Sequence, residues 1–213
     1  MGLAVEVGTL AYWLNDTKPD KEGVEWLRKK LARINKTLTE AGLPEHHEPE
    51  TLPARKSRAY LSSFSYSDIH YLRRAVAYAR QAPEKFCPLP EGANPARDPM
   101  IDNELSIYMD SHFICHSDCE GFYVPIDFEE ILYDDGLPGV MLGSSQQALT
   151  EIVRAAPLLG IALTDGELSD KEASKIAKDT NDLGQYWIER QVWLTMYEVF
   201  RYSIAQGTVV MFT

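Results

Sequence analysis

Apolar residues recur at three- and four-residue spacing in five segments of the chain, and this periodicity predicts five helices. The clearest covers about residues 22–41, where Asp20 suits the start and Gly42 suits the end. Its apolar face would consist of Val24, Leu27, Leu31, Ile34 and Leu38. Shorter helices are predicted at about 67–81, 144–156 and 169–178. A last helix at about 183–206 is apolar on almost every side, which is typical of a buried central helix.

Segments rich in β-branched and aromatic residues predict a small sheet. Residues 3–10 alternate loosely between apolar and polar positions, and residues 208–213 resemble a C-terminal strand. Residues 105–116 and 122–128 are rich in Ile, Phe and Tyr and flank a turn-like segment, which predicts an antiparallel hairpin over 105–128.

These elements together indicate an α+β fold. We expect one globular domain over residues 1–213, with about five helices packed on a small, mainly antiparallel sheet. The connection at 82–103 contains five prolines and no periodicity. It lacks the Gly/Ser-rich or charged composition of a flexible tether, so we interpret it as a soft boundary within one domain.

Composition narrows the cellular setting. Apolar residues make up 45% of the chain and charged residues 25%, which is ordinary for a globular protein. No basic and apolar leader follows Met1, and the longest apolar stretch is far shorter than the roughly 20 residues of a membrane helix. Three cysteines favour a reducing compartment over a disulfide framework. We therefore expect a cytoplasmic protein that binds no membrane.

Charge is the most unusual property of the sequence. The formal net charge is −11, yet no lysine or arginine occurs between Arg97 and Arg154. Outside that interval, 21 basic residues face 20 acidic ones. A regional excess of one charge costs self-repulsion and indicates a surface for a partner of opposite charge, which excludes nucleic acid. The interval holds twelve carboxylates: Asp98, Asp102, Glu104, Asp110, Asp118, Glu120, Asp127, Glu129, Glu130, Asp134, Asp135 and Glu151.

The leading hypothesis is a non-enzymatic interaction protein that uses residues 98–151 to bind a basic protein. Small acidic bacterial inhibitors neutralise basic toxins such as nucleases by electrostatic steering, so an immunity-type inhibitor fits this charge pattern. Tyr123 and Tyr133 are the candidate aromatic anchors of this surface. The acidic candidates are Asp118, Glu120, Asp127, Glu129, Glu130, Asp134 and Asp135.

One cluster has the chemistry of metal ligands. His112, Cys115, His116 and Cys119 place two imidazoles and two thiols within eight residues, and zinc prefers these donors. On a helix all four would share one face, whereas on a strand His112 and His116 would lie about 13 Å apart with Cys115 on the opposite face. The neighbouring residues favour a strand, and therefore a structural role without zinc or another cofactor.

Two alternatives stay open. The chain could be an enzyme or ligand-binding domain in which a histidine and a carboxylate near residues 112–120 act together, with or without a metal. No phosphate-binding loop, dinucleotide-binding turn, zinc-protease helix or nucleophile elbow supports that reading. The apolar helix at 183–206 could also form a homo-oligomer interface, although burial within one chain explains it equally well.

Overall fold

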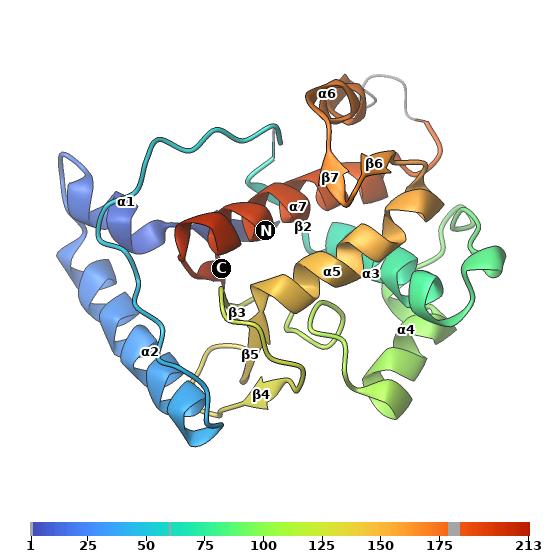
Figure 1. Ribbon diagram of the computed structural model, residues 1–213. Helices are drawn as coiled ribbons and strands as arrows, with labels where there is room; N and C mark the ends of the chain where they lie inside the picture. The colour runs from blue at the N-terminus through green and yellow to red at the C-terminus, as the bar shows by residue number, and fades with distance from the viewer. Residues whose placement is uncertain (1, 60, 179–183) are drawn as a thin grey trace.

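A six-stranded mixed sheet forms the centre of the computed structural model, which describes residues 2–59, 61–178 and 184–213 (Figure 1). The strand order is β2-β1-β8-β3-β5-β4, and only the β3–β5 pair is parallel. The fold is therefore α+β with a mainly antiparallel sheet, as predicted. The strands of this sheet are β1 (Gly2–Val7), β2 (Ser63–Ser65), β3 (Gly121–Val124), β4 (Leu132–Tyr133), β5 (Met141–Ser144) and β8 (Val210–Phe212).

Both faces of the sheet are covered by helices. Alternate side chains of β3 point to opposite sides: Phe122 and Val124 join the apolar cluster of α2 (Lys21–Glu40), whereas Tyr123 belongs to the cluster of α7 (Trp187–Gln206). The helices α3 (Tyr66–Gln81) and α5 (Ser145–Ala155) complete the second cluster. In Figure 1, α2 is separate from the bundle of α3, α5 and α7. Apolar clusters of buried residues therefore lie on both faces of the sheet.

The five predicted helices are present, and local capping explains several of their boundaries. The Asp20 side chain accepts a hydrogen bond from the Gly23 N–H at 2.9 Å, which begins α2. The Ser144 hydroxyl accepts from the Gln147 N–H and begins α5, as the sequence predicted. The Ser169 hydroxyl does the same for Glu172 at α6 (Asp170–Lys178). The predicted start of the last helix, Leu183, lies outside the described residues.

Residues of the same chain bury most of α7. Residues 191–200 are all buried, so the core of one chain accounts for the apolar circumference of the helix. A two-stranded sheet of β6 (Leu163–Thr164) and β7 (Glu167–Leu168) follows the turn Ala156–Leu159 and leads toward α6. In the described residues, no helix is long and apolar enough to cross a membrane.

Two sequence predictions about local structure were wrong. The first strand ends at Val7, and after Gly8 the chain forms the helix α1 (Thr9–Asn15). The hairpin over 105–128 does not exist, because β3 pairs with β5 and β8 instead. The residues before β3 form short helices and turns: Pro83–Lys85, Pro95–Arg97, α4 (Pro99–Asn103) and a π-helical turn at Glu104–Tyr108. The aromatic and aliphatic residues at 111–116 are buried as an irregular loop, since tertiary contacts override strand propensity there.

Candidate functional site

The most acidic exposed segment is the connection between the two parallel strands. Parallel neighbours need a crossover, and here residues 125–140 leave β3, add β4 at the edge of the sheet and return into β5. We call residues 125–140 the acidic loop. Five of its side chains are carboxylates: Asp127, Glu129, Glu130, Asp134 and Asp135. In Figure 1 this yellow segment lies beside α2.

An ion pair between the half-buried Arg33 and the buried Asp134 fixes the acidic loop to α2. The Arg33 guanidinium donates two hydrogen bonds to Asp134, at 2.6 and 2.5 Å, and the Thr37 hydroxyl donates a third at 2.5 Å. These donors, Arg33 first, hold the pKa of Asp134 well below its usual range. The Lys30 ammonium also donates to the Gly136 carbonyl at 3.1 Å. Asp134 is therefore an internal anchor, which corrects its prediction as a partner-binding residue.

The other end of the acidic loop is held by the protein body. The Gln147 amide donates to Asp127 at 2.7 Å, and the His112 ring nitrogen Nε2 lies 3.1 Å from the Glu129 carbonyl oxygen. Gly139 has a φ of 68°, and a Cβ at this position would collide with the Glu120 carbonyl. That close approach brings Glu120 to the border of the acidic loop. The carboxylates therefore project from a backbone that is fixed at several points.

Two arginines and one histidine from outside the interval bind several of its other carboxylates. Arg74 binds Asp98, Arg80 binds both Glu104 and Asp110, and His70 lies 3.0 Å from Asp118. Glu151 is buried and accepts from the Ser111 hydroxyl and from two backbone N–H groups. Counting carboxylates in the sequence suggested one continuous acidic surface. The structure shows that residues 98–151 do not form one.

Most of the exposed carboxylates in that interval that form no ion pair with a described residue lie on or beside the acidic loop, and Asp102 on α4 is a further one. Glu129, Glu130 and Asp135 are exposed and form no ion pair with any described residue, and the same is true of Glu120 at the border. Tyr133, with 60% of its surface exposed, and Val140, with 45%, add apolar area between these charges. The arrangement combines fixed negative charge with an aromatic ring, the two features that bind a cationic protein surface.

Tyr123 was predicted as a second aromatic anchor, and the structure contradicts this. Its ring is fully buried, stacks on His116 at 4.1 Å between centroids and meets Phe200 edge-on. The alternation of β3 turns Tyr123 toward α7 rather than toward solvent. The exposed Val140 on the acidic loop was missed, because nothing in its sequence context marks a positive φ of 64° and an outward side chain.

The His/Cys cluster is not brought together as a ligand set. In the described part of the chain, no three or more His, Cys, Asp or Glu side chains converge on one point. The ring nitrogens of His116 lie 3.0 and 3.2 Å from the carbonyl oxygens of Ser117 and Phe122. His112 accepts from the Ser144 N–H at 2.9 Å through Nδ1. Burial raises the pKa of the Cys115 thiol to about 11, which disfavours the thiolate that a metal needs.

An arginine organises this segment instead. The fully buried guanidinium of Arg73 donates to the carbonyls of Phe113, His116 and Ser117, the shortest at 2.5 Å. It thereby gathers several carbonyls of the irregular loop around one cation. Both histidine rings have at most 2% of their surface exposed, so neither is open to a substrate as an acid or base.

Comparison with known proteins identifies the family. A family model described as "Putative DNA-mimic protein" matches residues 1–212, almost the whole chain. The chain belongs to this family. No curated protein and no solved structure matches it.

Membership in the DNA-mimic family corrects the leading hypothesis from the sequence. A DNA mimic is directed at proteins that bind DNA, so the prediction of an immunity-type inhibitor of a basic toxin is wrong. The non-enzymatic part of that prediction agrees with the family. The acidic block is common to both classes, so the charge pattern of the sequence could not separate them.

Two buried groups behind the acidic loop of this DNA-mimic protein should give opposite pH dependences of stability. Burial raises the pKa of Glu151 from 4.5 to about 7, so its contribution is present at low pH and is lost as pH rises toward 7. Burial lowers the pKa of His116 from 6.5 to about 4, so its contribution is present above pH 6.5 and is lost as pH falls toward 4. Between about pH 5 and 6.5 the two contributions offset each other.

We predict that Glu151→Gln exposes the His116 contribution alone. The free energy of unfolding of this variant should rise by about 1–2 kcal/mol between pH 5 and 6.5, as measured by urea denaturation. In the matched variant His116→Gln, the free energy of unfolding should fall by a similar amount between about pH 5 and 6.5. Parallel pH profiles in the two variants would contradict the assignment.

Proposed function

We propose that this protein acts as a DNA mimic through the acidic loop. In this proposal the carboxylates of Glu129, Glu130 and Asp135, with Glu120 beside them, take the positions of DNA phosphates on a DNA-binding protein. The observation that carries it is that these four form no ion pair with any described residue, whereas arginines bind Asp98, Glu104 and Asp110 elsewhere in the acidic interval. Phosphate-binding surfaces consist of clustered Lys and Arg, which bind carboxylates by the same charge-assisted hydrogen bonds.

The anchoring of the acidic loop favours mimicry over simple solubility. A solvated acidic face needs no fixed geometry, whereas competition with DNA requires charges held in a register that the partner already recognises. Asp134 buried against α2 and the contact of Asp127 with Gln147 provide such a frame. Tyr133 would contact apolar surface between the cations of the partner. We place this activity in the cytoplasm, in keeping with three cysteines that are all free.

Charge neutralisation tests the proposal. A partner is first captured from nuclease-treated extract, purified, and loaded with fluorescent duplex DNA. Wild-type protein should displace the DNA, and Glu129→Gln/Glu130→Gln/Asp135→Asn should require about 10–100-fold more protein because three charge-assisted contacts are lost. The displacement by wild-type protein should also weaken steeply with added salt.

A control variant separates the surface from the net charge. Glu84→Gln/Glu91→Gln/Asp165→Asn removes three exposed carboxylates outside the acidic loop and gives the same total charge. It should displace DNA as wild type does. Equal losses of DNA displacement in both variants would show that only the overall charge matters. A partner that binds this protein and DNA simultaneously would contradict mimicry.

A further inference from the structure

Exposed apolar side chains are concentrated on the turn that follows α4. Ten large hydrophobic residues are exposed in the described part of the chain, and four of them fall within five consecutive positions. Each of the four has between 48% and 68% of its surface exposed. A group of this kind on the surface of a protein marks a site of interaction. We call these four side chains the apolar patch: Leu105, Ile107, Tyr108 and Met109.

The turn that carries the apolar patch is fixed to α3. Glu104 at its start is fully buried, and its carboxylate accepts from Arg80 at 3.0 Å and from the Gln81 amide at 2.9 Å. The Met109 N–H donates to the Glu104 carbonyl at 2.8 Å, which closes the π-helical turn. Arg80 also binds Asp110 directly after the turn. One arginine therefore holds both ends of the turn, and the apolar side chains are exposed on a fixed backbone.

One anion and one cation border the apolar patch. Asp102 is exposed and lies three positions before Leu105 in the same helical run. Arg154 on α5 is exposed and lines a cavity of about 380 Å³ together with Tyr108. Neither Asp102 nor Arg154 forms an ion pair with a described residue. A surface that has one such charge of each sign beside an apolar centre is complementary to a copy of itself related by a twofold axis.

The apolar patch is separate from the acidic loop. In Figure 1, the light-green continuation of α4 protrudes at the lower right, whereas the yellow acidic loop lies beside α2. All four residues of the patch come from one turn that ends before residue 110, so none of them belongs to the segment 125–140. A contact through the patch therefore leaves the carboxylates of the acidic loop uncovered.

We propose that the apolar patch binds the same patch of a second copy and forms a reversible homodimer with twofold symmetry. In this dimer, Asp102 of each chain pairs with Arg154 of the partner subunit. Four side chains at this exposure present on the order of 400 Å² per chain, so the contact lies at the small end of specific interfaces and dissociates at micromolar concentration. A different protein with charge of one sign would leave either Asp102 or Arg154 unpaired. This proposal does not depend on DNA mimicry.

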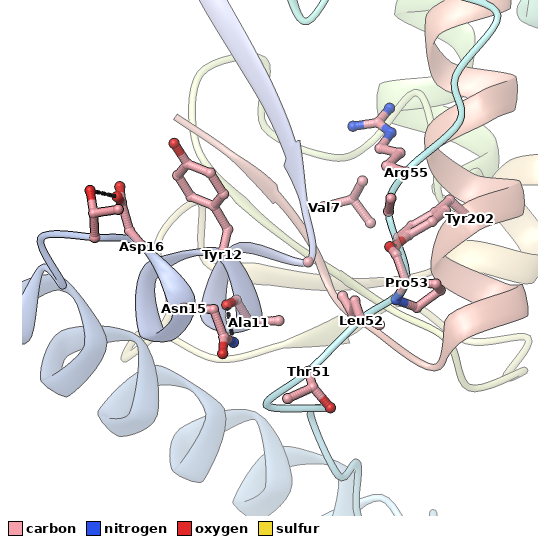
Figure 2. A pocket seen from close by; sticks show the side chains of 13 residues that line it. Val7, Ala11, Tyr12, Asn15, Asp16, Thr51, Leu52, Pro53, Arg55 and Tyr202 are labelled. Carbon is pink, nitrogen blue, oxygen red and sulfur yellow. Dashed lines mark hydrogen bonds between the residues drawn. The ribbon is translucent and has the colours of Figure 1, made fainter.

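Analytical ultracentrifugation of the whole chain between about 1 and 200 µM, at physiological ionic strength, tests the proposal. The average mass of the wild-type protein should rise with concentration from 24.1 kDa toward twice that value. Ile107→Lys should weaken association about tenfold or more, because it places two lysines in the apolar centre of the dimer. Tyr12→Lys is the matched control, since Tyr12 on α1 (Figure 2) is 69% exposed against 68% for Ile107 and the substitution adds the same charge. This control should associate as wild type does.

An exchange of charges separates a second copy from any other partner. Asp102→Lys and Arg154→Glu should each weaken association about tenfold, since each places like charges together across the interface. The double variant Asp102→Lys/Arg154→Glu recreates the pair with its signs exchanged and should restore association to within about threefold of wild type. The proposal is overturned by a wild-type protein that stays monomeric throughout the concentration range, by equal effects of Ile107→Lys and Tyr12→Lys, or by a double variant that associates as weakly as the single variants.

Discussion

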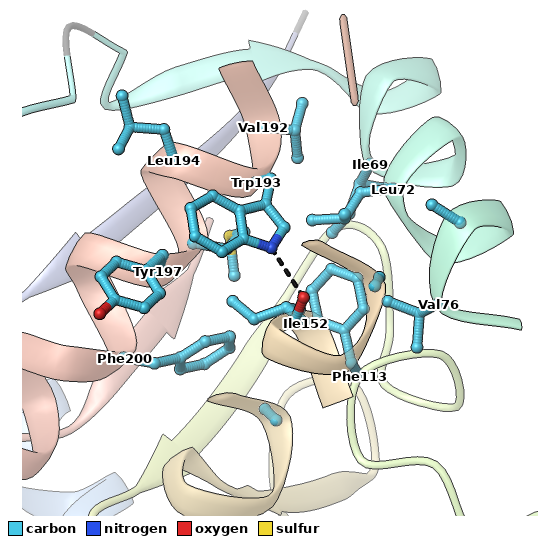
Figure 3. Packing of buried hydrophobic residues seen from close by; sticks show 14 of the residues in the cluster. Ile69, Leu72, Val76, Phe113, Ile152, Val192, Trp193, Leu194, Tyr197 and Phe200 are labelled. Carbon is cyan, nitrogen blue, oxygen red and sulfur yellow. Dashed lines mark hydrogen bonds between the residues drawn. The ribbon is translucent and has the colours of Figure 1, made fainter. Parts of the chain in front are cut away.

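Replacing Trp193 with alanine is expected to lower the free energy of unfolding by about 3–5 kcal/mol. The indole is fully buried at the centre of α7, stacks on Tyr197 at 4.8 Å and donates to the Ile152 carbonyl at 2.7 Å. Figure 3 shows Ile69 and Phe113 close to the same ring. The substitution leaves a cavity between three helices that cannot close without moving their backbones, and it leaves a buried carbonyl without a donor.

Thermal and chemical denaturation measure this effect, with a Tm decrease on the order of 10 °C. Trp187 on the same helix is the matched control, because 37% of its surface is exposed. Trp187→Ala should cost about 1 kcal/mol or less. Similar losses of unfolding free energy in Trp193→Ala and Trp187→Ala would show that α7 is not the centre of the core.

Replacing Asp98 with alanine should lower the free energy of unfolding by about 3–5 kcal/mol, because it leaves the buried charge of Arg74 without its partner. Arg74 donates to Asp98 at 2.6 Å, and the two side chains are 3% and 7% exposed. A second nitrogen of Arg74, Nη1, has no acceptor among the residues that the structure describes. The carboxylate also accepts from the Met100 N–H at 2.9 Å, where it caps α4. Its removal therefore leaves both a cation and a helix end unsatisfied.

A double-mutant cycle isolates the ion pair. Arg74→Met in the Asp98→Ala background should recover part of the loss, since the uncompensated buried charge disappears. The exposed pair Arg28–Glu50 is the reference, with side chains 54% and 66% exposed, and Glu50→Ala should cost less than about 1 kcal/mol. The interpretation fails if Asp98→Ala is no more costly than Glu50→Ala in urea denaturation.

The helices were predictable because their signals are local. The apolar face of α2, the Asp20 cap and the end near Gly42 all lie within one stretch of sequence. The same holds for the Ser144 and Ser169 caps. The hairpin over 105–128 failed because the backbone there is fixed by distant groups, Arg73 on α3 and Glu151 on α5. No pattern within the segment encodes those partners.

The candidate site was predictable only in part. Charge counting located the acidic interval, and Glu129, Glu130, Tyr133 and Asp135 are exposed on it. Counting could not show which carboxylates point inward, because Arg33 and Asp134 are 101 positions apart in sequence. The burial of Tyr123 depends on which face of β3 meets α7, and that follows from the strand order of the whole sheet.

The central position of β8 has a consequence for synthesis of the chain. β8 lies between β1 and β3 and joins them, so the sheet consists of two separate halves until it is added. It is also the last strand of this sheet in chain order. A nascent chain therefore holds two unpaired edges, on β1 and β3, while the ribosome completes the rest of the sheet. During that interval the growing polypeptide is exposed to aggregation and to chaperone binding, and the two halves of the sheet can join only after Val210–Phe212 has emerged.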